Sequence, residues 1–212
     1  MKIHPRTDHK GQPVKIAKPT QATPVSNCED SQQVVIVEPN GIVPKSLNDI
    51  SLASWAEVPG NTQAWLSVQA PFDEPPIEPK PGKKLSAGVV TVESDGRFWV
   101  VFPTNAFGGY KCTFPKGTIE SGLTAQATAI CEAFEESGLR VELIGLIGDF
   151  ERTTSVTRYY LAKRIGGNPA DLGWESQAVG LIPQSCLSEF LHHPNDKPIM
   201  EKALALLAKQ GK

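Results

Sequence analysis

Apolar and polar residues alternate over short stretches in the second half of the chain, and turn residues separate these stretches. Residues 85–94 and 97–104 flank Asp95-Gly96, a dipeptide typical of tight hairpin turns. Three further strand-like stretches are VELIGLIGDF (141–150), SVTRYYLAKRI (155–165) and WESQAVGLIP (174–183). A helix is expected over 124–137, ending at Gly138. Strands on either side of one helix predict a layered mixed α/β domain.

The helical pattern returns near the C-terminus. We expect two short helices, over QSCLSEFLHH and over KPIMEKALALLAK, the second capped by Asp196. Together with the helix over 124–137, they predict an α/β/α arrangement, with helices on both sides of a mixed sheet.

The first 80 residues differ from the rest of the chain in composition and periodicity. Residues 1–30 are polar, carry prolines and lack a period, so we expect them to be mobile. QQVVIVEP (32–39) predicts a short strand, and 46–58 is either a short helix or an irregular segment docked by its apolar side chains. Five prolines in 70–84 indicate an extended connector. We therefore divide the chain into an irregular, partly disordered extension (1–80) that wraps onto a main domain (81–212).

Composition and charge exclude several protein classes. The chain has 212 residues, of which 40% are hydrophobic and 21% charged, as in soluble globular proteins. A net charge of −2 without a Lys/Arg run argues against a nucleic-acid partner. No apolar stretch approaches the roughly 18 residues that a membrane span needs, and the basic N-terminus lacks the apolar core of a secretory signal. The four cysteines are scattered without a CxxC pair, which favours reduced thiols and a cytoplasmic location.

The expected helix over 124–137 carries three glutamates near its C-terminal end. Glu132, Glu135 and Glu136 are related by i, i+3 and i, i+4, so they share a face. That face lies roughly opposite the expected buried stripe of Ala127, Ile130 and Phe134.

This placement of the glutamates is unfavourable in two ways. Like charges at these spacings cost a few tenths of a kcal/mol (about 0.2–0.5) per pair, and the helix dipole disfavours anions in the last turn. Within the expected helix, no lysine or arginine lies three or four positions away from any of the three glutamates. Two interpretations stay open on spacing alone: a solvated acidic face, or a site for a hard divalent cation with oxygen ligands. The turn FPKGTIESG before the helix brings main-chain groups beside the carboxylates and favours the cation.

The segment from Gly117 to Leu139 resembles the Nudix box of the Nudix hydrolases, G-x5-E-x7-R-E-U-x-E-E-x-G-U, where U is aliphatic. The positions that match are Gly117, Glu132, Glu135, Glu136, Gly138 and Leu139, with Ala133 a weak match for the inner aliphatic position. Two positions depart from the pattern: Leu123 replaces the first glutamate and Cys131 replaces the arginine. The order of strands and helices over roughly 84–208 also resembles the family.

The resemblance implies a fold, a reaction and a cofactor. The fold would be the Nudix α/β/α sandwich with a mixed sheet. The reaction would be Mg²⁺- or Mn²⁺-dependent hydrolysis of an acid anhydride, the pyrophosphate bond of a nucleoside diphosphate-linked or similar polyphosphate small molecule. Glu135 and Glu136 would be the principal metal ligands, with the carbonyl of Lys116. Glu132 would bind metal or take the proton of the attacking water.

The two departures bear on how well this chemistry would run. Leu123 removes a carboxylate that supports the metal in the family, and Cys131 removes a cation that steadies the glutamates. Cys131 is not expected to be a nucleophile, because neighbouring carboxylates raise a thiol pKa. The alternative function is therefore a catalytically weakened Nudix-fold module that binds or senses a nucleotide. A structural domain with an acidic face is the third hypothesis.

Five residues outside the box are candidates for the same site. Glu175 resembles the acidic residue that many Nudix enzymes carry beyond the box as a further metal ligand, or it is an exposed loop glutamate. Lys111, Arg152 and Arg158 could contact phosphates, or be solvated residues at strand edges. Tyr110 could stack on a base or ring, or pack internally. The expected partner is a small phosphorylated molecule, with no nucleic acid and no membrane; a homodimer stays open.

Overall fold

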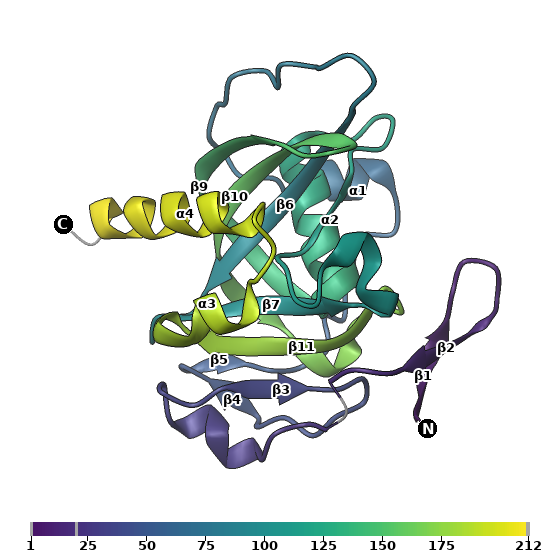
Figure 1. The fold of residues 1–212 in the computed structure, drawn as a ribbon, viewed down its shortest axis with the longest axis vertical. Coiled ribbons are helices and arrows are strands. Elements are labelled where there is room, and N and C mark those ends of the chain that lie inside the picture. The colour runs from purple at the N-terminus through teal and green to yellow at the C-terminus, as the bar shows by residue number, and fades with distance from the viewer. Residues whose placement is uncertain (1, 20, 211–212) are drawn as a thin grey trace.

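The computed structural model of the protein describes residues 2–19 and 21–210. At its centre is a seven-stranded sheet in the order β3-β11-β7-β6-β10-β9, with β8 paired to β6 off this path (Figure 1). β6 and β10 are parallel and the other pairs are antiparallel. The strands are β3 (Val35–Val37), β6 (Lys84–Val92), β7 (Arg97–Pro103), β8 (Lys116–Thr118), β9 (Leu139–Glu151), β10 (Ser155–Gly167) and β11 (Ser176–Pro183).

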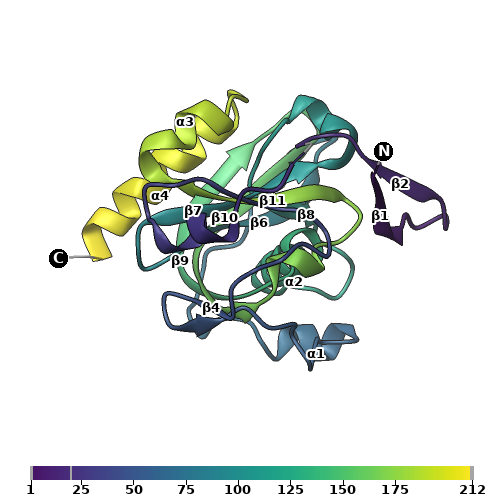
Figure 2. The ribbon, with the colours of Figure 1, turned by 90° about the horizontal axis from the view of Figure 1, so that it is seen from below.

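Helices cover both faces of this sheet, which confirms the predicted α/β class (Figure 2). Helix α2 (Ala125–Ser137) packs on one face, and α3 (Leu187–Phe190) and α4 (Asp196–Gln210) lie on the other. Each face has its own hydrophobic cluster, the first around Ile130 and Leu139, the second around Phe114 and Ile199. The 3-10 helices are η1 (Val25–Glu29), η2 (Thr104–Gly109), η3 (Pro169–Asp171) and η4 (Gln184–Cys186). No helix in the described residues is both long and apolar enough to cross a membrane.

The boundaries of α2 follow from its capping residues. The Thr124 hydroxyl accepts a hydrogen bond from the backbone N–H of Ala127 at 3.1 Å, which satisfies a donor of the first turn. Gly138 ends the helix in the left-handed region at φ 71°, where its N–H donates to the carbonyl of Phe134. The helix predicted over 124–137 is therefore confirmed.

The face of α2 that is buried is wider than predicted. Ala127 and Ile130 are buried, but so are residues outside the expected stripe, whereas Phe134 is only partly buried. The cause is the N-terminal extension, because α1 (Thr62–Leu66) packs on α2 and the ring of Trp55 meets Phe134 edge-on at 5.4 Å. A single helix pattern cannot reveal a second layer that a distant segment supplies.

The extension contains more regular structure than its sequence predicts. Residues 2–16 form a hairpin of β1 (Lys2–Thr7) and β2 (Pro13–Ile16), which projects from the domain (Figure 1). Its only buried side chains are His4 and Val14, so the apolar alternation that would predict strands is missing. The strand predicted within 32–39 is confirmed as β3, which joins the main sheet beside β11.

Residues 46–58 form an irregular segment and no helix. A very short hairpin of β4 (Ser46–Leu47) and β5 (Ile50–Ser51) turns through Asn48 and Asp49, both at positive φ. Leu47 and Leu52 are buried on either side of it. Of the two alternatives, the irregular segment docked by apolar side chains is the one that forms, because the positive φ values at Asn48 and Asp49 are incompatible with a helical turn.

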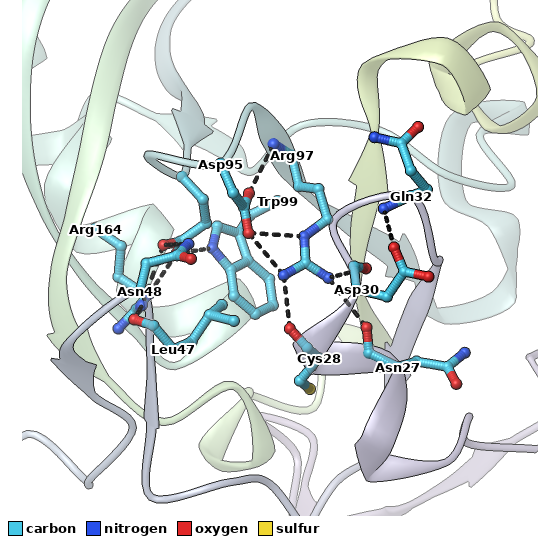
Figure 3. A network of polar contacts seen from close by, with 11 residues as sticks. Asn27, Cys28, Asp30, Gln32, Leu47, Asn48, Asp95, Arg97, Trp99 and Arg164 are labelled. Atoms are coloured by element: carbon cyan, nitrogen blue, oxygen red, sulfur yellow. Dashed lines mark hydrogen bonds and ion pairs between the residues drawn. The ribbon is translucent and has the colours of Figure 1, made fainter.

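Two buried arginines of the main domain hold the extension in place (Figure 3). Arg97 on β7 donates to the carboxylate of Asp95 and to three main-chain carbonyls of residues 27–30. Arg164 on β10 pairs with Glu93 and donates to the carbonyl of Leu47 at 2.8 Å. Buried guanidinium groups with every donor aimed at carbonyls and carboxylates fix geometry strongly. The extension therefore wraps onto the main domain, as its lack of an own core predicted.

Candidate active site

The site begins where α2 meets β8. The carboxylate of Glu132 lies against the backbone of Gly117, so closely that a Cβ atom at residue 117 would be 1.7 Å from Oε1 of Glu132. Gly117 in turn pairs with Ala87 of β6 in the sheet. The strand–turn–helix sequence therefore places this carboxylate at the sheet, and a larger residue at 117 would push the carboxylate out of this position.

The three glutamates of α2 differ in their exposure. Glu136 is buried at 8% exposure, Glu132 is partly buried and Glu135 is exposed. A simple solvated acidic face is therefore wrong for Glu136. The reason is tertiary: β8 and β11 pack against α2, and the backbone of Lys116 on β8 forms a hydrogen bond with Glu136.

Burial and mutual repulsion raise the pKa values of two of these carboxyls. The pKa of Glu132 is raised first by burial and then by the charges of Glu136, Glu135 and Glu175. Burial also raises the pKa of Glu136, which the Lys116 ammonium and a backbone hydrogen bond from Lys116 partly oppose. Lys116 is the cation that the helix itself lacks. One ammonium among four carboxylates leaves a surplus of negative charge in a poorly solvated place.

Glu175 reaches this cluster from the loop that precedes β11. Its side chain is exposed, yet partial burial and then the charge of Glu135 raise its pKa. The loop is held to η2, since the backbone N–H of Thr104 donates to the carbonyl of Glu175 at 2.7 Å and its hydroxyl donates to that of Trp174 at 2.7 Å. Glu175 is thus an exposed loop glutamate whose charge acts on Glu132 and Glu136, and its role as a metal ligand stays a prediction.

A pocket of about 370 Å³ opens beside the carboxylates. Its lining includes the charged residues Lys116, Glu136 and Glu175 and the aromatic residues Trp174 and His9. His9 lies at the tip of the β1–β2 hairpin and meets the ring of Trp174 edge-on at 5.3 Å. The extension therefore contributes directly to the site.

The donor set fits a hard divalent cation by its chemistry. Carboxylates and main-chain carbonyls are the ligands that Mg²⁺ and Mn²⁺ take, and a bound cation would relieve the repulsion that raises these pKa values. In residues 2–19 and 21–210, no group of three or more His, Cys, Asp or Glu side chains already stands in a metal-binding arrangement. Coordination therefore requires the glutamate side chains to turn towards one another.

Tyr110 is buried against this site and does not offer a free ring. Its ring stacks on His193 at 3.9 Å, and Nζ of Lys116 lies 5.4 Å from the ring centroid. The hydroxyl accepts hydrogen bonds from Arg152 and Asn195, each at 2.8 Å. This environment favours the packing interpretation of Tyr110. The packed ring also makes a cation–π contact with Lys116.

The structure pairs the two candidate arginines with protein groups. Arg152 is buried and binds Asp196 at the start of α4 at 3.3 Å, as well as the hydroxyl of Tyr159. Arg158 is buried and forms a two-pronged pair with Asp149 at 2.7 and 2.8 Å. Neither arginine is a solvated edge residue, and neither lines the pocket beside the glutamates.

Lys111 and the two departures from the box occupy simpler surroundings. Lys111 is exposed and makes no ion pair within the described chain. Leu123 is partly buried and packs against the cluster around Ile130. Cys131 is buried, and burial followed by the charge of Glu135 raises its thiol pKa, in line with the expectation that it is no nucleophile.

Sequence reasoning did not identify three residues of the site. His9 lies in a segment whose pattern gave no sign of ordered structure, and Thr104 belongs to a short 3-10 helix that no period marks. Trp174 stood out only as an aromatic residue beside Glu175. No local signal would have found His9, because only the docking of the hairpin brings it to the pocket.

Comparison with known proteins gives a matching family. The model of the NUDIX domain matches residues 82–203, more than half of the chain. RNA pyrophosphohydrolases of Pseudoalteromonas atlantica and Pseudoalteromonas translucida are 32% and 28% identical over 108 and 121 residues. These matches cover 50% and 53% of this chain and 58% and 66% of the relatives, so the chain spans less than two thirds of their length.

The fold also resembles solved structures. A Caenorhabditis elegans Ap4A hydrolase complex superimposes with a TM-score of 0.49 at 21% identity, covering 58% of this chain and 98% of that one. A second solved protein, from Nitrosomonas europaea, gives a TM-score of 0.48 at 22% identity and covers 57% of this chain and 70% of its own.

Proposed function

Because the chain belongs to the NUDIX domain family, we propose that it is a Mg²⁺- or Mn²⁺-dependent pyrophosphohydrolase. Its substrate would be a nucleoside diphosphate-linked or similar polyphosphate small molecule. One observation carries this proposal: Glu132 and Glu136 are withdrawn from solvent at the end of α2, opposite the single ammonium of Lys116. Such a concentration of negative charge is costly without a cation and becomes useful with one.

The residues of the site divide the work of hydrolysis. Glu135, Glu136, Glu175 and the main-chain carbonyl of Lys116 would hold the metal. A bound divalent ion supplies charge neutralisation for the phosphates and lowers the pKa of water. Glu132 would accept the proton of the attacking water as the water oxygen bonds to phosphorus and the bridging oxygen leaves with the other phosphate. The raised pKa of Glu132 suits a group that must hold this proton.

The relatives support a substrate that contains a pyrophosphate bond. Their name, RNA pyrophosphohydrolase, describes cleavage of such a bond in those proteins. For this chain we extend the inference only to the bond type. The pocket beside Trp174 and His9 offers aromatic surfaces on which a planar ring would rest, next to the carboxylates.

A second candidate function is a binding module that does not cleave its ligand. The observation in its favour is Leu123, which packs into the hydrophobic cluster where the box pattern has a carboxylate. The retention of Glu132, Glu135 and Glu136 favours the enzyme, because a binding module has no need for all three.

Chromatographic detection of the phosphorylated products from a substrate panel tests the proposal. The panel comprises ADP-ribose, diadenosine polyphosphates, nucleotide sugars, diphosphoinositol polyphosphates and oxidised deoxynucleoside triphosphates, each with Mg²⁺ or Mn²⁺. Glu132→Gln should lower kcat at least about 100-fold, as expected for loss of a general base. Glu142→Gln is the matched control, since Glu142 is an exposed residue that pairs with Lys163. Metal binding without turnover of any compound would favour the binding module.

A further inference from the structure

A second pocket lies along β8, the strand Lys116–Thr118. Its volume is about 510 Å³. Lys84, Lys116 and five hydroxyl side chains line it, and its described lining contains no carboxylate and no large apolar side chain. The pocket beside Trp174 is aromatic and acidic, so the two differ in chemistry although Lys116 borders both.

The register of the sheet builds this second pocket. Ser86 of β6 lies opposite Thr157 of β10 on one side and opposite Thr118 of β8 on the other, so three hydroxyl residues form a row across three strands. Two positions away on the same face, Lys84 lies opposite Ser155. Strand pairing fixes these positions, and the turn residues Gly82 and Thr154 complete the lining.

Several donors of the pocket are unused by the protein. Ser86 is 7% exposed, and within the described residues neither its hydroxyl nor that of Thr118 has a hydrogen-bond partner. Lys84 forms no ion pair there, whereas its neighbour Lys83 is engaged by Glu151 at 3.1 Å. Thr157 and Ser155 share one hydrogen bond at 3.0 Å.

We propose that this pocket, defined by Lys84, Ser86, Thr118 and Thr157, binds a phosphoryl group of the substrate beyond the scissile pyrophosphate. Hydroxyl and ammonium groups donate hydrogen bonds to phosphate oxygens, and no carboxylate is among the residues that line the pocket. This inference rests on the proposed function and narrows it. The substrate then carries more than two phosphoryl groups and extends across Lys116 from one pocket into the other.

Kinetics with diadenosine diphosphate and diadenosine tetraphosphate test this inference, because the two compounds differ only in the number of phosphates. We expect Lys84→Ala to lower kcat/KM for the tetraphosphate at least about tenfold, because the variant loses one charge-assisted hydrogen bond to the substrate. The value of kcat/KM for the diphosphate should stay unchanged. Ser86→Ala removes a hydroxyl with little change of volume and should act in the same direction. Lys163→Ala is the control, since it removes an equal charge from the far end of β10.

Titration calorimetry with inorganic tripolyphosphate, without metal, measures the pocket independently of turnover. We expect binding by the native chain and at least about tenfold weaker binding by Lys84→Ala. Equal hydrolysis of both dinucleotides, unaffected by Lys84→Ala, would overturn the inference and leave the proposed function standing. Tripolyphosphate binding that depends on Lys84, with no hydrolysis of any compound, would support the anion pocket and overturn the enzyme. If neither binding nor hydrolysis occurs, both fail.

Discussion

The carboxylate of Glu132 rests against the backbone of Gly117, with 1.7 Å between its Oε1 atom and the place where a Cβ would stand on that glycine. This contact joins two residues that are 15 positions apart in the chain. The glycine gives the strand its close approach to the helix, and the helix places the carboxylate at the edge of β8. Any larger residue at 117 must displace the proposed base.

Gly117→Ala should therefore reduce activity more than stability. The added methyl group pushes on the end of a flexible side chain, so we expect kcat to fall at least about tenfold, as expected for a misplaced catalytic group, while the free energy of unfolding changes by less than about 1 kcal/mol. Gly60→Ala is the control, because no atom lies within 4 Å of a Cβ built there. An unchanged kcat in Gly117→Ala would remove Glu132 from the mechanism as placed here.

The buried carboxyls predict a stability that depends on pH and on metal. The pKa values of Glu132 and Glu136 are raised in the folded chain, so the folded state keeps their protons to a higher pH than the unfolded state. Their contribution to stability is complete below the unfolded pKa of about 4.3 and is lost as pH rises through the folded values. With a chelator present, Tm should therefore fall between about pH 5 and pH 8.

Mn²⁺ should reverse this loss, because metal binds the deprotonated carboxylates and stabilises the folded chain more at high pH. Thermal melts with and without Mn²⁺ at both pH values measure the effect. Glu132→Gln should flatten the metal-free profile, since the amide does not titrate. A metal-free Tm that rises steadily over the same range would contradict the assignment of raised pKa values.

The hairpin tip should affect substrate binding more than chemistry. His9 lines the pocket and contacts Trp174, but it does not touch the α2 glutamates. We expect His9→Ala to raise KM roughly three- to tenfold, the loss of one aromatic contact of about 1 kcal/mol, with kcat almost unchanged. Lys10→Ala is the control, because Lys10 is an exposed residue beside His9 that does not line the pocket. Identical KM values for both variants would exclude the hairpin from substrate binding.

Arg158 is expected to stabilise the fold and to leave KM unchanged. Its guanidinium group pairs with Asp149 and also donates to the carbonyl of Pro75, so it ties the proline-rich connector to the sheet. Arg158→Met should lower the free energy of unfolding by about 3 kcal/mol, since it leaves a buried network without its cation. Urea denaturation measures the loss, and limited proteolysis should show faster cleavage within residues 70–84. A large rise in KM with unchanged stability would instead support the phosphate-contact interpretation of Arg158.

Local sequence patterns determined the main-domain elements and the core of the candidate site. The period over 124–137 and the stop at Gly138 specify α2, because helix formation and capping depend on residues within a few positions of one another. The spacing of Glu132, Glu135 and Glu136 likewise follows from helical geometry alone. Asp95-Gly96 marks the turn between β6 and β7 for the same reason.

Tertiary structure decided which segments pack against these local elements. The burial of Glu136, the counter-charge from Lys116 and the arrival of His9 all come from segments far away in the chain. Arg158 could not be assigned from the sequence for the same reason, because its partners Asp149 and Pro75 lie on other segments of the chain. Packing between distant segments determines how far each charged side chain is exposed to water. It thereby determines which charges are paired within the protein. The sequence by itself therefore specified the carboxylate-bearing helix, and the folded chain alone specified the pockets and the charges around it.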